Sequence, residues 1–182
     1  MSSWEKVARR IRVPLGFLFA LIYVWLSRPT MPSILTGSLL VTLGLIVRAL
    51  ASGYLRKNEE LATSGPYAYT RNPLYLGSII LAAGFAIAGR SIWIAVCLAA
   101  FFILIYIPVI LSEEASLREH FHNFEDYASE VPRLLPRLRG SVNIPGSFSW
   151  DLYRKHREYN AALGSVLLIM VLLTKVLWCC RD

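Results

Sequence analysis

Charged residues are scarce in this sequence. They make up 17% of its 182 residues, whereas hydrophobic residues make up 55%. Soluble chains usually carry about 25% charged residues, and here the deficit is concentrated in uncharged runs such as Ile92 to Leu111. The composition therefore predicts an integral membrane protein and argues against a soluble enzyme of this size. It also argues against disorder, which requires a chain too polar to form a core.

Cysteines and familiar catalytic motifs are equally sparse. The three cysteines are Cys97, Cys179 and Cys180, and their spacing suits neither a metal site nor a disulfide framework. His120 and His122 would diverge on a helix and His156 is distant, so we expect no metal site. The sequence has no G-x-G-x-x-G, P-loop, H-E-x-x-H or G-x-S-x-G motif, which leaves the common nucleotide-binding and hydrolase signatures unmatched.

Five apolar stretches approach the length of a membrane span, which is roughly 20 residues. They are Ile11 to Leu26, Ile34 to Ala51, Leu74 to Gly89, Ile92 to Leu111 and Ala161 to Leu177. The first and third are short, so each would cross fully only if interfacial side chains extend it, and otherwise would lie in the membrane plane or cross in part. We expect one all-α membrane domain over residues 1–182, a multi-pass bundle of about five spans.

The lysines and arginines predict the orientation of these spans. If the N-terminus is cytoplasmic, most of them fall in cytoplasmic segments, as the positive-inside rule requires. The polar sequence then lies in two cytoplasmic segments, residues 52–73 and 112–160, where we expect any chemistry. This distribution and anionic lipid account for the net charge of +7, so we expect membrane lipids and no nucleic acid as partners. The short chain favours a prokaryotic inner membrane, with the endoplasmic reticulum as the eukaryotic equivalent.

Small residues recur along the second and third stretches. Gly37, Gly44 and Ala51 are seven residues apart on one, and Gly77 and Gly84 are seven apart on the other. Small residues at such spacing let two helices approach closely in lipid. The pattern predicts a tightly packed hairpin, although glycine is also simply common in membrane helices.

The first cytoplasmic segment carries the elements of an anion site. Asn72 and Pro73 place a capping residue and a helix-initiating proline directly before the third span. The exposed N–H groups of a helix N-terminus favour an anion, and Arg71 adds a full positive charge. Aromatic faces for a cation are supplied by Tyr67, Tyr69 and Tyr75. The alternative is that these residues are interfacial anchors.

The second cytoplasmic segment has the period of an amphipathic helix. Leu117, Phe121, Phe124, Ala128 and Val131 share one face of a helix over 117–131. We expect this helix to lie along the membrane surface and cover a cytoplasmic pocket, although a plain amphipathic linker explains the period as well. A linker does not explain Glu113 and Glu114, because a carboxylate near lipid is energetically unfavourable unless it has a polar or charged partner.

The order of these motifs is familiar. Residues 61–67 read Leu-Ala-Thr-Ser-Gly-Pro-Tyr and residues 71–77 read Arg-Asn-Pro-Leu-Tyr-Leu-Gly. Glu113 and Glu114 follow after a helical hairpin, and Tyr127 precedes Val131 by four residues. Over about residues 55 to 137, the chain resembles the isoprenylcysteine carboxyl methyltransferase family and its phospholipid methyltransferase relatives.

The resemblance implies a multi-span enzyme that takes S-adenosylmethionine (SAM) from the cytosol and methylates a lipid-embedded acceptor, either a prenylated cysteine or a phospholipid. Carried over by position, the cofactor would touch Glu59, Glu60, Leu61, Ala62, Tyr67, Asn72, Pro73, Leu74, Tyr75 and Glu113. Arg71, or the helix N-terminus beside it, would bind the carboxylate of SAM. The tyrosine faces would take the sulfonium, and Glu113 the ammonium, as the residue expected to be catalytic.

Three departures from the family pattern leave the acceptor open. Asn72 stands where the family usually has histidine, and Phe124 stands where a tyrosine is expected. Val109 stands where the prenylcysteine enzymes have an arginine that helps hold the substrate carboxylate. A carboxylate acceptor, with a pKa of roughly 3.5, needs no base, whereas an amine with a pKa near about 10 needs one, for which Glu113 or Glu114 is available.

Two other functions remain open from the sequence. One is a membrane reductase of the sterol type, which shares a related architecture and uses a nicotinamide cofactor. The other is a small non-enzymatic scaffold or transport subunit. The polar segments gathered on one side and the near absence of charge within the spans argue against a transport path.

Overall fold

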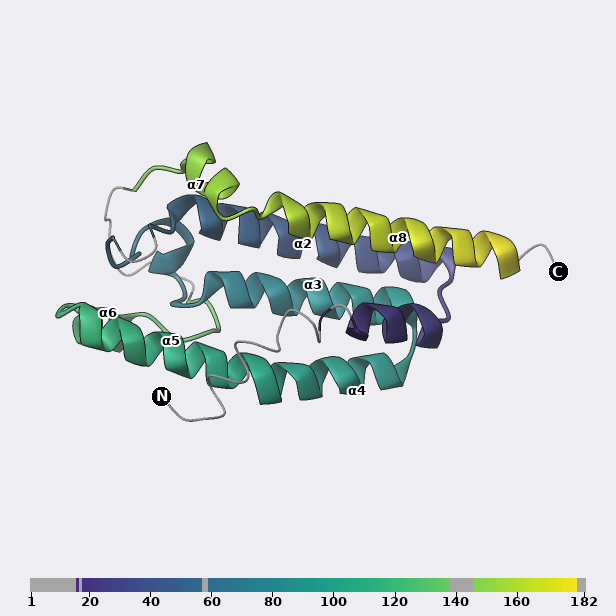
Figure 1. The fold of residues 1–182 in the computed structure, drawn as a ribbon, viewed down its shortest axis with the longest axis horizontal. Coiled ribbons are helices and arrows are strands. Elements are labelled where there is room, and N and C mark those ends of the chain that lie inside the picture. The colour runs from purple at the N-terminus through teal and green to yellow at the C-terminus, as the bar shows by residue number, and fades with distance from the viewer. Residues whose placement is uncertain (1–15, 17, 57–58, 138–145, 180–182) are drawn as a thin grey trace.

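The structure is a computed structural model that describes residue 16 and residues 18–56, 59–137 and 146–179. These residues form helices and turns without a strand, as the sequence predicts (Figure 1). After a short helix over residues 18–26, the elements are α2 (Met31–Tyr54), the 3₁₀ turn η1 (Gly65–Ala68), α3 (Pro73–Gly89), α4 (Ile92–Phe101), the π turn η2 (Phe102–Tyr106), α5 (Ile107–His120), α6 (Phe124–Glu130), α7 (Trp150–Lys155) and α8 (Tyr159–Cys179).

Three helices are long and apolar enough to cross a membrane: Met31–Tyr54, Ile92–His120 and Tyr159–Trp178. Helix α3 is apolar but shorter, with 17 residues. The first predicted span falls partly on residues 11–15 and 17, which lie outside the described residues. The structure thus supports three of the five predicted spans by length and composition, and the orientation of the bundle stays a prediction.

Helices α2 and α3 form the predicted hairpin, because glycine removes the side chains between them. A Cβ placed on Gly37 would lie 2.5 Å from the carbonyl oxygen of Gly84, and one on Gly44 would lie 2.7 Å from that of Gly77. Neither distance leaves room for a side chain. The closely packed pair gives the bundle its central element (Figure 1).

The second long helix runs from Ile92 to His120 through a π turn at residues 102–106. Pro108 explains this turn: proline has no N–H to donate and its ring clashes with the preceding turn, so the helix widens just before it. The amide of Ile107 donates instead to the carbonyl oxygen of Phe102. The predicted fourth span is therefore part of a longer helix that carries Glu113 and Glu114 beyond Leu111.

The single amphipathic helix predicted over 117–131 is wrong. Helix α5 ends at His120, Phe121 is extended with φ −125°, and α6 begins only at Phe124. Leu117 therefore belongs to the continuation of the long helix and does not lie on a separate surface helix. The apolar period persists across the break because Phe124 and Val131 are both buried in the same interior.

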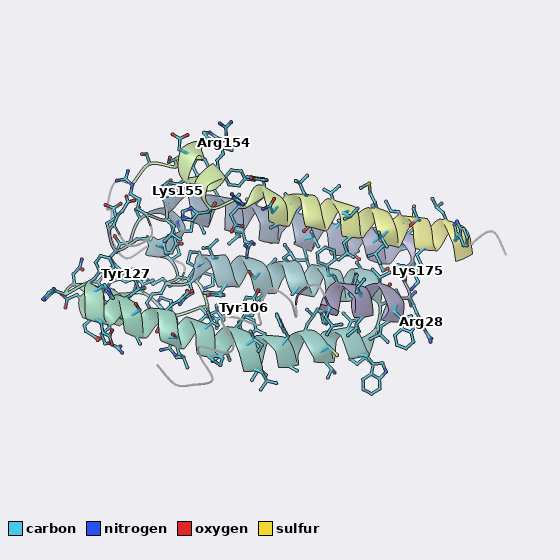
Figure 2. The ribbon with its side chains drawn as sticks, viewed as in Figure 1. Arg28, Tyr106, Tyr127, Arg154, Lys155 and Lys175 are labelled. Atoms are coloured by element: carbon cyan, nitrogen blue, oxygen red, sulfur yellow. The ribbon has the colours of Figure 1, made fainter. Side chains whose placement is uncertain are left out.

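The two ends of the bundle differ. Figure 2 shows Tyr127, Arg154 and Lys155 at the end that carries α6 and α7, and Arg28 and Lys175 at the opposite end. Lys175 fastens that far end, since its Nζ donates to the carbonyl oxygens of Val24 and Ser27, both at 2.7 Å. The positive charge of Lys175 therefore lies at the C-terminal end of the short first helix, where the helix dipole favours a cation. The main cavity opens at the other end.

Candidate active site

A cavity of about 980 Å³ lies among α2, α3, α5, α6 and the α7–α8 junction. This volume falls at the upper end of the roughly 300–1,000 Å³ usual for small-molecule sites. Figure 2 shows Tyr127, on α6, at the end of the bundle and Tyr106, in the π turn η2, nearer the middle, and both side chains line the cavity. The cavity therefore reaches from the polar end of the bundle into its apolar part.

The start of α3 forms one wall. Pro73 occupies the first turn, where its missing N–H costs nothing, and the carbonyl oxygen of Asn72 accepts from the amides of Tyr75 and Leu76 at 3.1 and 3.0 Å. The predicted capping by the Asn72 side chain does not occur. Its Nδ2 donates instead to Glu114 Oε1 and to the carbonyl oxygen of Arg133, both at 3.0 Å.

Glu114 is the hub of the polar contacts. Its side chain is only 6% exposed, and besides Asn72 it meets the Nε of Arg133 at 3.0 Å and the Nη1 of Arg71 at 3.7 Å. Buried carboxylates require such partners. One anion thus joins three separate segments: α5, the residue before α3, and the loop after α6.

Arg71 is held between this hub and the cavity. Its backbone amide donates to the carbonyl oxygen of Pro132 at 2.9 Å, and its side chain is 13% exposed. Its Nε is buried and has no hydrogen-bond partner within the described part of the chain. A buried N–H without a partner costs free energy, and other parts of Arg71 line the cavity.

Tyr67 and Tyr127 tie η1 to α6. The hydroxyl of Tyr127 donates to the carbonyl oxygen of Tyr67 at 2.8 Å. Burial raises the pKa of the Tyr67 phenol well above its usual value of 10, and the nearby Tyr127, Glu113 and Glu158 raise it further. Burial likewise raises the pKa of Tyr127, although Arg71 opposes this in part. Both phenols are therefore neutral at physiological pH.

A family model for phospholipid methyltransferases matches residues 15–123. The chain belongs to the phospholipid methyltransferase family. This membership agrees with the resemblance seen in the sequence and gives the chain a membrane methyltransferase domain. The match ends before Tyr127, so the part of the cavity built by α6 and by the junction between α7 and α8 lies beyond it.

Two relatives are clearly similar. The chain is 38% identical over 142 residues to the nickel-cobalt-cadmium resistance protein NccN of Alcaligenes xylosoxydans xylosoxydans, which covers 78% of this chain and 60% of the relative. It is 37% identical over 141 residues to the cobalt-zinc-cadmium resistance protein CzcN of Cupriavidus metallidurans, which covers 76% and 62%. The chain thus matches less than two thirds of either relative. No solved structure matches it.

The cavity gathers the predicted cofactor residues except Glu59. Those that line it are Glu60, Leu61, Ala62, Tyr67, Arg71, Asn72, Pro73, Leu74, Tyr75 and Glu113. Glu59 is exposed and meets Lys155 Nζ at 3.4 Å. Within the described residues, no group of three or more His, Cys, Asp or Glu side chains is arranged to hold a metal ion.

Several lining residues were not predicted. Arg48, Ser78, Tyr106, His156 and Glu158 all line the cavity. Arg48 is the sole charged residue within the second apolar stretch, and a charge within a span is a functional signal in itself. His156 and Glu158 carry no comparable signal, because only the folded chain brings them to α2 and α3.

Proposed function

We propose that this member of the family is a SAM-dependent methyltransferase whose acceptor is embedded in the membrane. The observation that carries the proposal is one cavity lined by Arg71, Glu113, Tyr67 and Tyr75, in which the Nε of Arg71 has no hydrogen-bond partner among the described residues. A cation, a carboxylate and aromatic faces in one cavity match the three charged or polarised parts of SAM.

The residues present fit SAM group by group. The carboxylate of SAM would accept from the guanidinium of Arg71, a planar fork of donors that lines the cavity. The sulfonium suits the aromatic faces of Tyr67 and Tyr75, and Tyr106 packs edge-on against Tyr75 with ring centroids 5.5 Å apart. Glu113 would pair with the ammonium. When bound, SAM supplies an activated methyl group.

The chain itself contributes orientation and the exclusion of water. Glu114 is committed to Arg71, Arg133 and Asn72, so it holds the wall of the cavity and is poorly placed to accept a proton. Glu113 is the carboxylate of the adjacent pair that faces the cavity without these contacts. We therefore assign to Glu113 both the ammonium contact and, for an amine acceptor, the role of proton acceptor.

The acceptor class separates two versions of this function. An isoprenylcysteine carboxyl methyltransferase would have to bind a carboxylate, yet Val109 is 1% exposed and packs in an apolar cluster with Tyr75, Ile105 and Ile110. No cation replaces the family arginine at that position. A phospholipid amine acceptor does not need that arginine, and the description of the matching family favours it.

The test is calorimetric binding of SAM to the detergent-purified chain, with NADPH as the control ligand. Arg71→Ala and Tyr75→Ala should weaken SAM binding. Loss of a buried charged contact costs about 2 kcal/mol or more, or about thirtyfold in Kd. Arg118→Ala and Tyr69→Ala are matched controls, since both side chains are exposed and lie outside the cavity. Absence of SAM binding by the folded wild type would refute the proposal, and NADPH binding would redirect it to a reductase.

A further inference from the structure

Helix α7 (Trp150–Lys155) lies on the outer side of the bundle at its polar end, away from α4 and α5 (Figure 1). None of its six residues is buried, although Leu152 and Tyr153 are half-buried. Isolated helices shorter than about 12 residues are marginal in water, and most helices in proteins are stabilised by packing of an apolar face. The bundle therefore supplies little of the packing that a helix of this length needs.

The open face of α7 carries an aromatic and a basic residue. Trp150 is 68% exposed, and Arg154 lies one turn further along the same face. The ring of Trp150 is held edge-on by Phe148 and Tyr153, with ring centroids 5.0 and 5.8 Å away. Tryptophan is enriched where a protein passes from lipid to water. A tryptophan that is fixed in place and still largely exposed is typical of a membrane interface.

The cations of this segment outnumber its carboxylates. The six residues of α7 and the two that follow contain Arg154, Lys155 and Arg157 but only one carboxylate, Asp151. Lys155 is paired with Glu59 at 3.4 Å. Arg154 and Arg157 are exposed, and neither forms an ion pair with a residue that the structure describes. Figure 2 shows Arg154 at the outer edge of the bundle, where its charge is open to an external anion.

The start of α7 is fastened to the last turn of α2. The amide of Ser149 donates to the carbonyl oxygen of Gly53 at 3.0 Å. The ring of Phe148 occupies the space that a side chain at Gly53 would need, and it packs edge-on against Tyr54 with ring centroids 6.3 Å apart. Helix α2 is long and apolar enough to cross a membrane, so α7 begins at the level where this span leaves the bilayer.

The end of α7 leads directly into the wall of the cavity, which His156 and Glu158 both line. Glu158 forms a two-point ion pair with Arg48 of α2, with Nε 3.0 Å from Oε2 and Nη2 2.9 Å from Oε1. Arg157, between the two cavity residues, has φ +55°, a left-handed conformation that costs a non-glycine residue free energy. The position of both cavity residues therefore depends on where α7 lies.

We propose that Trp150, Arg154 and Arg157 form a docking surface for a bilayer that contains anionic phospholipid, and that this contact holds the α7–α8 junction in the cavity wall. The indole lies among the headgroups, and the two guanidinium groups bind lipid phosphates of the same leaflet. The charge of the membrane then sets how firmly one wall of the cavity is held. The inference goes beyond the proposed function, because it concerns the membrane around the chain whatever the cavity binds.

The position of α7 favours a bilayer over an acidic protein as the occupant of this surface. An exposed aromatic residue beside basic residues is the pattern by which interfacial helices bind lipid. Each basic residue near an anionic membrane surface strengthens binding by about fivefold. An acidic protein would account for the two arginines, but it would not account for an exposed Trp150 beside the end of a span.

The first test measures which phospholipid the purified full chain retains in native mass spectrometry, with dioleoyl phosphatidylglycerol and dioleoyl phosphatidylcholine supplied in equal amounts. Arg154→Gln with Arg157→Gln should lower the preference for phosphatidylglycerol by about fivefold or more. The matched control, Arg154→Lys with Arg157→Lys, keeps both charges and should keep the preference. A wild-type preference in the glutamine variant would overturn the docking surface.

A second measurement uses a variant that leaves the arginines in place. The emission of Trp150 is obtained as the difference between the wild type and Trp150→Phe in nanodiscs. It should be quenched by phospholipid brominated in its acyl chains close to the headgroup, and much less by acrylamide in the water. Quenching by acrylamide without quenching by the brominated lipid would place Trp150 in water and overturn the proposal, even if the arginine variants did not fold.

Hydrogen exchange tests whether the contact reaches the cavity wall. In the wild type, amides of residues 150–158 should exchange about fivefold more slowly in nanodiscs that contain phosphatidylglycerol than in nanodiscs of phosphatidylcholine alone. Residues 112–120 on α5 are the internal control and should exchange equally in both. The difference over 150–158 should disappear in Arg154→Gln with Arg157→Gln. Equal exchange of the wild type in the two membranes would overturn the link between membrane charge and the α7–α8 junction.

Discussion

Replacing Glu114 by glutamine tests whether one buried carboxylate organises the candidate site. Glutamine keeps the size of the side chain but removes its charge, and it offers one acceptor oxygen in place of two. Its NH₂ group must then face either the donor of Asn72 or the donors of Arg71 and Arg133. At least one of these contacts becomes a donor facing a donor.

The magnitude depends on burial. Arg133 is 51% exposed, so its share of the pairing is about 0–1 kcal/mol. Arg71 is 13% exposed and forms an ion pair with Glu114 at 3.7 Å, and leaving a buried charged group without its partner costs about 1–3 kcal/mol. We expect Glu114→Gln to lower the free energy of unfolding by about 2–4 kcal/mol in total, and SAM affinity to fall because Arg71 is no longer held.

The assay is denaturant unfolding of the detergent-purified chain, followed by SAM calorimetry under conditions in which the variant is folded. Glu119→Gln on the same helix is the control, because that side chain is exposed and its loss should change stability by no more than about 0.5 kcal/mol. The reasoning fails if Glu114→Gln unfolds like the control and binds SAM like the wild type.

Three further predictions follow from the described contacts. Gly44→Ala should destabilise the hairpin by about 1–3 kcal/mol, because its Cβ would lie 2.6 Å from a backbone nitrogen on α3, whereas Gly164→Ala on α8 meets nothing within 4 Å and should be neutral in the same unfolding assay. Glu113→Ala should abolish methyl transfer in a radiolabel assay while leaving membrane insertion intact, and wild-type turnover would remove Glu113 from the site. The phenols of Tyr67 and Tyr127 keep their protons in the folded state beyond their usual pKa of 10. Their contribution to stability should therefore be constant below about pH 10 and decrease above it, with a smaller decrease in Tyr127→Phe, as thermal unfolding across pH would show.

The sequence predicted features that depend on local spacing. Glycines seven residues apart predicted the α2–α3 hairpin, and an asparagine followed by proline predicted the start of α3. The sequence did not predict the helix break at Phe121. An apolar period of 3.6 residues is retained across a break when the helices before and after it both bury their apolar residues in the protein. Periodicity reports which residues are buried and does not report whether the backbone between them is continuous.

The other cavity residues that the sequence did not predict are brought together by contacts between segments far apart in the chain. Arg48 and Glu158 meet across 110 residues of sequence, and neither has a neighbour in the sequence that indicates the other. Glu59 was predicted by position from the family resemblance, yet the chain turns there and, of the two adjacent glutamates, only Glu60 lines the cavity. The segment that resembles known methyltransferases supplies most residues that line the cavity, whereas His156 and Glu158, between α7 and α8, are brought to it only in the folded chain.

The π turn at residues 102–106 makes the length of the second long helix as important as its hydrophobicity. Each residue of a helix advances the side chains by about 100°. With Pro108 and the turn in place, a deletion of one residue between the turn and Glu113 would rotate Glu113 and Glu114 by that angle relative to α4. Point substitutions among these apolar residues should therefore be tolerated far better than insertions or deletions. Homologous sequences should vary in residue type along this helix but keep its length constant.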